Sequence, residues 1–153
     1  MRPKSERGFT LIELLIVVAI IGIIAAIAIP NLLSAIQRGR QKRTMADVRS
    51  IGTAAETYAI DNGYVPNSAE GTVTTAVGPY LSPTFIRTLP AIDGWKQSFQ
   101  WVHALGGSEY TIQSGGADTS KNGCAINVIT KKFDCDICYA NGQFTQWPEG
   151  TQD

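Results

Sequence analysis

This sequence of 153 residues has few histidines, few cysteines and no formal net charge. It has one histidine, His103, three cysteines and a formal net charge of zero. A chain without excess cationic charge gives no indication of nucleic-acid binding. Zinc needs four suitable ligands, which these residues do not supply, so we interpret His103 as an ordinary sheet residue. No nucleophile with its base, phosphate-binding loop or carboxylate pair can be recognised, and we do not expect an enzyme.

Polar residues are nearly missing from residues 9–33. Only Thr10, Glu13 and Asn31 are polar there, whereas the rest of the chain is rich in Gly, Thr, Ser and Asn. About 20 apolar residues cross the hydrocarbon core of a bilayer. A secretory signal peptide would end in a small-residue cleavage site after the apolar run, and none is evident. We therefore expect a retained membrane segment joined to one modest soluble domain.

Glu13 is the one carboxylate inside the apolar run. An acidic side chain toward the bilayer centre costs on the order of 2.5–3.5 kcal/mol and is usually paired or functional. Its place near one end of the run lowers this cost, because the side chain can reach the interface. We favour a functional role, which requires a partner for the charge.

The stretch "KSERGFTLIELLIVVAIIGIIAAIAIP" resembles the leader and N-terminal helix of the type IV pilin superfamily. A short basic leader ends in Gly8, Phe9 follows it, and Glu13 stands five residues after Gly8. Gly22 and Pro30 occupy the places where pilins carry a helix-weakening glycine and proline. The resemblance implies that residues 1–8 are removed between Gly8 and Phe9 by a membrane-embedded prepilin peptidase, and that the new Phe9 amine is N-methylated.

This cleavage would supply the partner that Glu13 needs. The new α-amine of Phe9 is cationic and lies four residues before Glu13 along the helix. In a filament, Glu13 of an incoming subunit would neutralise the Phe9 amine of its neighbour, because an unpaired charge in apolar surroundings is costly. We assign this pair a role in setting the stagger between subunits. The resemblance also implies that the helix loosens between Gly22 and Pro30 in a filament, while an isolated subunit keeps it continuous.

A stripe of apolar residues continues the helix beyond the membrane segment. Its members recur at spacings of three and four: Met45, Val48, Ile51, Ala55, Tyr58, Ala59 and Asn62. This period predicts an amphipathic helix over residues 34–62, after a transmembrane and filament-core half over residues 9–33. Residues 61–63, "DNG", would end it. The basic residues at 38–43 fit either a solvated or headgroup-facing surface or an intersubunit salt-bridge patch.

The remainder predicts a connecting loop and a small sheet. Residues 63–94 are rich in proline and lack a sustained period, which is typical of a loop with at most a short helical turn. Residues 95–153 hold the strand signals "SFQWVHA", "EYTIQSG", "CAINVIT", "KFDCDICYA" and "QFTQW", with Asn141 and Gly142 as a hairpin turn. We expect an α+β fold in which the long helix packs on an antiparallel sheet, as in type IV pilins.

A second resemblance narrows the function. "NGYVP", "DGWKQSFQW" and "EYTIQSGGAD" are similar to the major pseudopilin of type II secretion. The chain departs from it by lacking a proline within Asp93–Trp95 and the acidic glycine-rich run after it, and by adding a cysteine-containing tail. The resemblance implies a structural subunit of the pseudopilus that drives protein export. The alternatives are a type IV pilin for adhesion, motility or DNA uptake, and a non-polymerising, membrane-anchored periplasmic binding protein.

The family resemblance also implies location and partners. The subunit would sit in the bacterial inner membrane with its N-terminus in the cytoplasm and its soluble domain in the periplasm, before joining a periplasmic or surface filament. Its partners would be copies of itself, the prepilin peptidase and N-methyltransferase, an inner-membrane assembly platform, a cytoplasmic ATPase, and minor pilins or pseudopilins.

The segment "DTSKNG", residues 118–123, has the spacing of an oxygen-rich cation loop. It is not an EF-hand, because Ile129 stands where the bidentate glutamate belongs. A simple polar turn is one interpretation, and a calcium site with Asp118, Ser120 and Asn122 as ligands is the other. Pseudopilin resemblance supports calcium. The sequence leaves open whether an aspartate from elsewhere, Asp93, Asp134 or Asp136, completes the shell.

Three cysteines cluster near the C-terminus, where a disulfide would pin the tail in an oxidising compartment. If residues 130–132 form a three-residue hairpin loop, Cys124 falls opposite Cys138 and Cys135 points to the other face. We favour a Cys124–Cys138 disulfide, with Cys124–Cys135 as the alternative.

Overall fold

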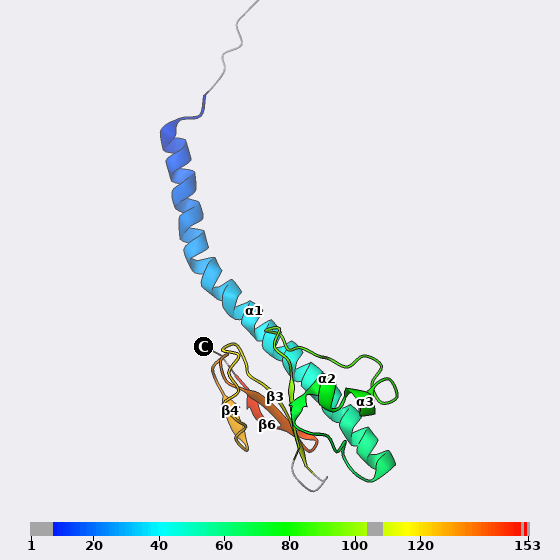
Figure 1. The fold of residues 1–153 in the computed structure, drawn as a ribbon. Coiled ribbons are helices and arrows are strands. Elements are labelled where there is room, and N and C mark those ends of the chain that lie inside the picture. The colour runs from blue at the N-terminus through cyan, green and yellow to red at the C-terminus, as the bar shows by residue number, and fades with distance from the viewer. Residues whose placement is uncertain (1–7, 104–108, 151, 153) are drawn as a thin grey trace, which may run out of the picture. The chain divides into compact units, whose positions relative to one another are not determined.

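The computed structural model describes residues 8–103, 109–150 and 152. The chain divides into two compact units, one ending at Ala35 and the other beginning at Ile36. A single helix, α1 (Leu11–Asn62), begins in the first and ends in the second, so the predicted continuous helix is confirmed (Figure 1).

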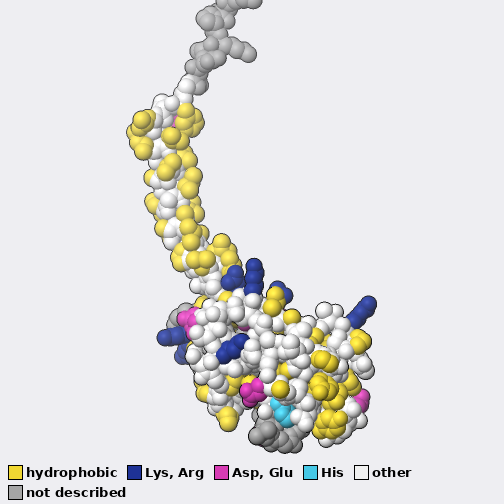
Figure 2. All heavy atoms as spheres, in the orientation of Figure 1, with side chains coloured by type: hydrophobic (Ala, Val, Ile, Leu, Met, Phe, Trp, Pro, Cys, Tyr) yellow, Lys and Arg dark blue, Asp and Glu magenta, His cyan; other side chains and the backbone are white. Residues whose placement is uncertain are grey.

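The first unit consists of the apolar part of α1. Its hydrophobic side chains are exposed on every side, and its most apolar 18-residue window has a mean hydropathy of 3.1 with no residue buried. Figure 2 shows this unit covered by hydrophobic side chains. Pro30 lies within the helix and removes one backbone donor, while the Asn31 side chain donates to the Ile27 carbonyl at 2.9 Å. A helix with this surface needs lipid or neighbouring helices around it.

The second unit is a six-stranded sheet packed against the C-terminal half of α1. The strands lie in the order β1-β2-β3-β5-β6-β4, and all neighbours are antiparallel except β4 and β6, which are parallel. The bounds are β1 (Gly71–Thr72), β2 (Gln100–His103), β3 (Tyr110–Ser114), β4 (Val128–Thr130), β5 (Ile137–Ala140) and β6 (Gln143–Pro148). The α+β fold predicted from the sequence is therefore confirmed.

Two local expectations about the sheet have opposite outcomes. Asn141 and Gly142 join β5 to β6 with φ values of 46° and 89°, as a tight hairpin turn between twisted strands requires. The hairpin over residues 130–132 is wrong, since β4 pairs with β6 and not with β5. Three consecutive β5 residues are buried and need strands on both sides, whereas Val128 and Ile129 of β4 are exposed and suit an edge.

The segment over residues 63–94 holds more structure than a loop with one helical turn. It contains β1, α2 (Val73–Ala76) and α3 (Gly78–Leu81). Thr72 caps α2, and Val73, Val77 and Leu81 are fully buried. The short helices thus close one side of the core, although their length gave too few residues for a visible period.

The core lies between one face of α1 and the sheet. The predicted stripe contributes Val48, Ile51, Ala55 and Tyr58, all buried, and the sheet side contributes Phe99, Trp101, Ile112 and Tyr139. Trp101 and Tyr110 stack with centroids 4.8 Å apart, and the Tyr110 hydroxyl donates to Glu56 Oε1 at 2.8 Å. Each fully buried large side chain contributes about 1.5–3 kcal/mol to stability.

Gly52 provides a test of this packing. A Cβ atom at this position would overlap Cε1 of Tyr139, whose ring is held edge-on by Phe144 at 5.0 Å. We expect Gly52→Ala to lower the free energy of unfolding by roughly 1–3 kcal/mol, because overpacking moves a fixed ring. Thermal unfolding of the detergent-solubilised chain measures this.

Gly39→Ala is the matched control, since nothing lies within 4 Å of its Cβ position. The control should be neutral or stabilise α1 by up to about 1 kcal/mol. Equal melting temperatures for the two variants would contradict the packing account.

Candidate functional site

The start of α1 is closed by reciprocal hydrogen bonds between Thr10 and Glu13. The Thr10 backbone N–H and hydroxyl donate to Glu13 Oε2 at 2.9 and 2.6 Å, and the Glu13 N–H donates to Thr10 Oγ1 at 3.3 Å. This is a capping box, in which a Thr and a Glu three residues later satisfy free donors at the helix start. The Thr-x-x-Glu spacing of Thr10 and Glu13 is a local signal for this cap, although the cap was not among the predictions from the sequence.

Glu13 is consequently held at a helix N-terminus with one oxygen engaged. Among the hydrogen bonds of the described residues, both accepted by the carboxylate go to Oε2 and none goes to Oε1. The positive end of the helix favours an anion here. Phe9, where the new amine would arise, is 78% exposed. The segment therefore presents an oriented carboxylate, whose Oε1 accepts no hydrogen bond from the described residues, beside the accessible Phe9 at which cleavage is predicted.

Gly22 and Pro30 both lie in regular helix. A Cβ at Gly22 would meet nothing within 4 Å, so packing within the chain does not demand this glycine. This agrees with the continuous helix expected for an isolated subunit. Loosening of the helix between Gly22 and Pro30 in a filament stays a prediction.

Asp93 is buried and serves the fold. Its Oδ1 accepts from the backbone N–H groups of Trp95 and Gln97 at 2.8 and 2.9 Å, and Oδ2 accepts from the Ser114 hydroxyl at 2.6 Å. The adjacent Gly94 N–H donates to Thr44 Oγ1 on α1 at 2.9 Å. Asp93 is thus fully occupied in tying this turn to β3 and is not a ligand candidate.

The predicted cation loop folds beside β5. Asp118 Oδ1 accepts from the Ser120 N–H at 2.9 Å, which forms a local turn. Asp118 and Asn122 line one open hollow together with Asp134, Asp136 and Lys132, whereas Ser120 is not part of the lining. The structure therefore brings together two of the three predicted ligands and two of the three additional aspartates.

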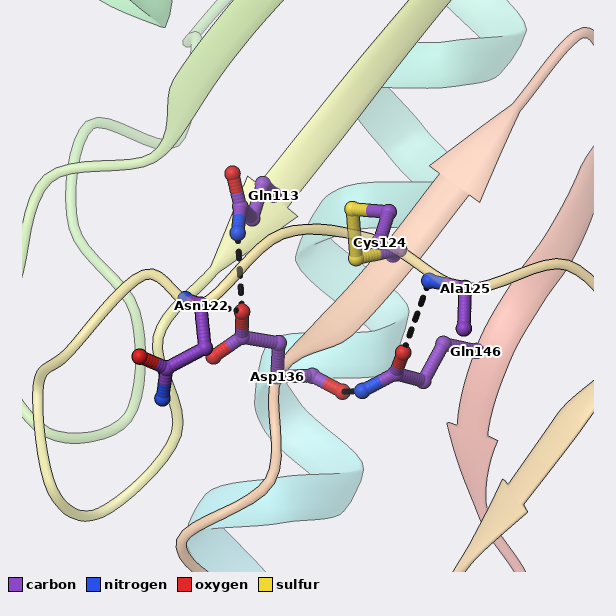
Figure 3. The surroundings of a disulfide bond; sticks show 7 residues. Gln113, Asn122, Cys124, Ala125, Asp136 and Gln146 are labelled. Carbon is purple, nitrogen blue, oxygen red and sulfur yellow. Dashed lines mark hydrogen bonds between the residues drawn. A yellow bond between two sulfur atoms is a disulfide. The ribbon is translucent and has the colours of Figure 1, made fainter.

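Asp136 is the buried group of this hollow. Its Oδ2 accepts from Gln113 Nε2 and from the Asn122 N–H, both at 2.8 Å (Figure 3). Its Oδ1 is buried and has no hydrogen-bond partner among the described residues. Burial raises the pKa of the Asp136 carboxyl above its usual range, against the lowering effect of these hydrogen bonds, and the nearby Asp118 charge adds to the rise.

In the part of the chain that the structure describes, no three His, Cys, Asp or Glu side chains are placed so that they could hold a metal ion together, although three aspartates line this hollow. His103 lies in β2 opposite Tyr110, as a sheet residue. A cation in the hollow would have to combine Asp118 and Asp136 with amide and backbone oxygens, a donor set that suits calcium rather than zinc.

A disulfide joins Cys124, which follows the loop, to Cys138 in β5. Cys135 is a free, half-buried thiol. Two hydrogen bonds through the Gln146 side chain flank the disulfide: Ala125 N–H donates to Oε1, and Nε2 donates to the Asp136 carbonyl, each at 3.0 Å (Figure 3). The loop is thus fastened to β5 and β6 immediately beside Asp136.

Comparison with known proteins supplies the family. Residues 3–29 match the prokaryotic N-terminal methylation motif, and residues 31–131 match the type II secretion system protein G family. The chain belongs to the type II secretion protein G family. It is therefore a pseudopilin, which favours the pseudopilus over the type IV pilus and the non-polymerising binding protein.

Curated relatives agree over most of the chain. A type II secretion system core protein G from Klebsiella michiganensis is 30% identical over 126 residues, covering 77% of this chain and 88% of the relative. The Escherichia coli K12 protein of the same name is 29% identical and covers 74% and 83%, and that of Pseudomonas aeruginosa is 28% identical and covers 80% and 92%.

The family match ends at residue 131, before two of the three cysteines of this pseudopilin. The pairing of Cys124 with Cys138 arises without the predicted hairpin. It follows from the path of the loop, which returns along β5, and from the Cα separation of 5.8 Å between the two residues.

Removing the disulfide should measurably destabilise the pseudopilin. We expect Cys124→Ala with Cys138→Ala to cost about 3 kcal/mol, because the unfolded chain regains the entropy of a loop of roughly 15 residues. This corresponds to a fall in melting temperature of roughly 10 °C. The matched control, Cys135→Ala, should melt like the parent. Non-reducing peptide mapping of the parent should yield the 124–138 pair, and a 124–135 pair would contradict the assignment.

Proposed function

We propose that this pseudopilin is cleaved between Gly8 and Phe9, is stored in the inner membrane through residues 9–33, and polymerises into a type II secretion pseudopilus. The observation that carries this is the uninterrupted succession of the methylation motif and the protein G domain along one chain. The apolar helix supports it, because it is long enough to cross a membrane and no residue of its most apolar window is buried by the described part of the chain.

Glu13 would set the register between neighbouring subunits. Oε2 is committed to the helix cap, while Oε1 has no partner among the described hydrogen bonds. The Phe9 amine of a processed neighbour is a cation that can donate to Oε1, leaving the cap intact. Since leaving either charge unpaired among apolar helices is far costlier than pairing them, only a stagger that brings the two together is favourable.

The remaining partners follow from these steps of cleavage, membrane insertion and assembly. A prepilin peptidase and N-methyltransferase would process Phe9, an assembly platform and a cytoplasmic ATPase would extract subunits from the inner membrane, and minor pseudopilins would join the filament. The soluble unit would lie in the periplasm. The disulfide supports this placement, because an oxidising compartment preserves such bonds.

Calcium binding by the hollow at residues 118–136 is part of the same proposal. The residues present fit the ion in two respects. The buried Asp136 Oδ1 lacks a hydrogen-bond partner among the described residues, and Asp118 lines the same hollow, so two carboxylates are available to balance the charge of the ion. Asp118, Asp136 and Asn122 would hold the ion, which would link the loop to β5.

Substitutions at the helix start test the role of Glu13. In a strain deleted for this gene, Glu13→Gln keeps an acceptor for the Thr10 cap but removes the charge, so we expect it to lose filament incorporation and secretion as fully as Glu13→Ala. Thr10→Val removes the cap and keeps the charge, and should retain most assembly. Sheared filaments, secreted protein and the mass of the Phe9 terminus are the readouts.

Membrane insertion and cleavage after Gly8 must remain intact in all three variants for the comparison to be valid. Normal filament assembly by the Glu13→Gln variant would contradict the ion-pair hypothesis. If the deletion strain secretes normally without this chain, the proposed secretion function is wrong.

Calcium dependence is measured by the thermal stability of the purified full chain. If calcium is present at about 100 times its dissociation constant, chelation should remove about 2.7 kcal/mol of stability and lower the melting temperature by several degrees. Asp118→Ala should abolish this response, whereas Glu70→Ala, also exposed, should retain it. An unchanged melting temperature of the parent on chelation contradicts calcium binding.

A further inference from the structure

Three asparagines of this chain are each followed directly by a glycine: Asn62, Asn122 and Asn141. In such a pair the glycine nitrogen can attack the asparagine side chain, because glycine has no Cβ atom to obstruct the approach and adopts many backbone conformations. The product carries a carboxylate in place of the amide. In a folded protein, the rate depends on how firmly the fold holds the side-chain amide and the attacking nitrogen.

The pair at the end of α1 is held on both sides. The Asn62 side chain donates to the Tyr58 carbonyl at 2.9 Å, and the Gly63 N–H donates to the Ala59 carbonyl at 2.8 Å. Both reacting groups are thus hydrogen-bonded to the last turn of the helix. These bonds must be lost before the glycine nitrogen can reach the side chain.

The pair in the β5–β6 turn is also held. Asn141 Oδ1 accepts from the Tyr110 N–H at 3.0 Å, which ties its side chain to β3. A Cβ atom at Gly142 would lie 2.9 Å from Glu56 Oε1, so this peptide is closely packed against α1. The fold therefore opposes reaction at Asn141 as well.

The third pair, Asn122–Gly123, lies in the irregular segment between β3 and β4, where residues 118–129 are all exposed. Among the hydrogen bonds of the described residues, none involves the Asn122 side chain, and none joins the Gly123 N–H to a backbone carbonyl. Gly123 has a φ of 92°, and a Cβ atom there would meet nothing within 4 Å. The side chain of this pair is therefore the least restrained of the three.

Asp136 is the group that borders this peptide. Its Oδ2 accepts from the Asn122 N–H at 2.8 Å (Figure 3). Burial raises the pKa of the Asp136 carboxyl, whereas the nearby Gly123 N–H is among the groups that lower it. An N–H group polarised by a carboxylate has more electron density on its nitrogen, so this contact favours attack by Gly123.

We propose that Asn122 is a site of spontaneous deamidation in this pseudopilin. The Gly123 nitrogen attacks Cγ of Asn122, and the side-chain nitrogen leaves as ammonia together with the Gly123 proton. Water then opens the resulting imide ring and leaves an aspartate or isoaspartate at position 122. Water is the only co-reactant, and no group is oxidised or reduced.

Deamidation would change the charge of the hollow at residues 118–136, and this consequence rests on the calcium site of the proposed function. Asn122 lines the hollow together with Lys132 and the aspartates Asp118, Asp134 and Asp136. A carboxylate at position 122 adds a negative charge and an oxygen ligand of the kind that calcium prefers. Newly made subunits and older ones would therefore differ in their affinity for calcium.

Peptide mass spectrometry of the purified full chain tests the modification. At mildly alkaline pH we expect Asn122 to convert about tenfold faster than Asn62 and Asn141, because their side chains must first lose hydrogen bonds. Digestion in acid stops the reaction, and heavy-oxygen water labels the carboxylates that form during the incubation. In denaturant the three rates should converge, because the fold no longer restrains any of the pairs.

The matched control is Asn122→Gln, which keeps an amide but places it one carbon farther from the attacking nitrogen. This variant should show no conversion at position 122 over the same period. Conversion of Asn122 no faster than that of Asn62 or Asn141 in the folded chain would overturn the proposal. A preference for Asn122 that persists unchanged in denaturant would also overturn it, because the fold would then have no part in the selectivity.

Calcium titration calorimetry tests the consequence. Asn122→Asp fixes the converted state with a side chain of nearly the same shape, and we expect it to bind calcium about tenfold more tightly than freshly purified parent chain. Parent chain after incubation should move toward the affinity of this variant, whereas incubated Asn122→Gln should not change. Equal affinities of Asn122→Asp and fresh parent would overturn the assigned role. Absence of calcium binding by all of these chains would overturn the proposed calcium site, whereas the modification is decided separately by the mass measurement.

Discussion

Close contact between small residues of α1 and aromatic rings of the sheet is the interaction on which the soluble unit depends. Gly52 leaves room for Tyr139, and Tyr110 reaches across to donate to Glu56. Burial and the neighbouring Glu56 raise the pKa of the Tyr110 phenol, so it stays protonated and keeps donating. Because the helix lies this close, the same α1 that presents an apolar surface in the first unit becomes the central element of a core in the second.

Buried polar contacts then fasten the irregular segments to α1. Thr44 receives the Gly94 N–H, and Gln41 donates to Gln152 at 3.3 Å near the end of the chain. Gln152 in turn donates to the Thr130 carbonyl at 2.9 Å, at the end of β4. Such groups are costly when buried without partners, so each bond constrains the segment that supplies it. Strand β4, whose Val128 and Ile129 are exposed, is thereby held in place by Gln152.

Local patterns in the sequence were sufficient for the parts of the fold governed by local physics. The apolar run, the stripe through Val48 and Tyr58, and the turn at Asn141 each reflect a period or a backbone preference within a few residues. The placement of β4 beside β6 was not predictable in this way. It depends on the competition of β3, β4 and β6 for the buried β5, and these strands span residues up to 38 positions apart, from Tyr110 to Pro148.

The candidate sites likewise include features that depend on neighbouring residues and features that depend on residues far apart in the sequence. The capping box around Glu13 is local and was readable from Thr10. Burial of Gln41 was not, because a glutamine on a helix looks solvent-facing until Gln152 is placed against it. Likewise, the meeting of Asn122 with Asp136 depends on how the disulfide returns the loop to β5.

An exposed apolar edge strand is normally an aggregation hazard, and β4 shows how this chain limits it. The strand has three residues and is followed at once by Lys131 and Lys132, which repel a second β4 edge. These features disfavour edge-to-edge pairing although Ile126 and Ile129 remain exposed. Such protection matters for a pseudopilin, because a polymer-forming subunit must not associate through the wrong faces. The lysines at the end of β4 therefore limit which strands can pair with this edge, which is specificity obtained by disfavouring a wrong contact.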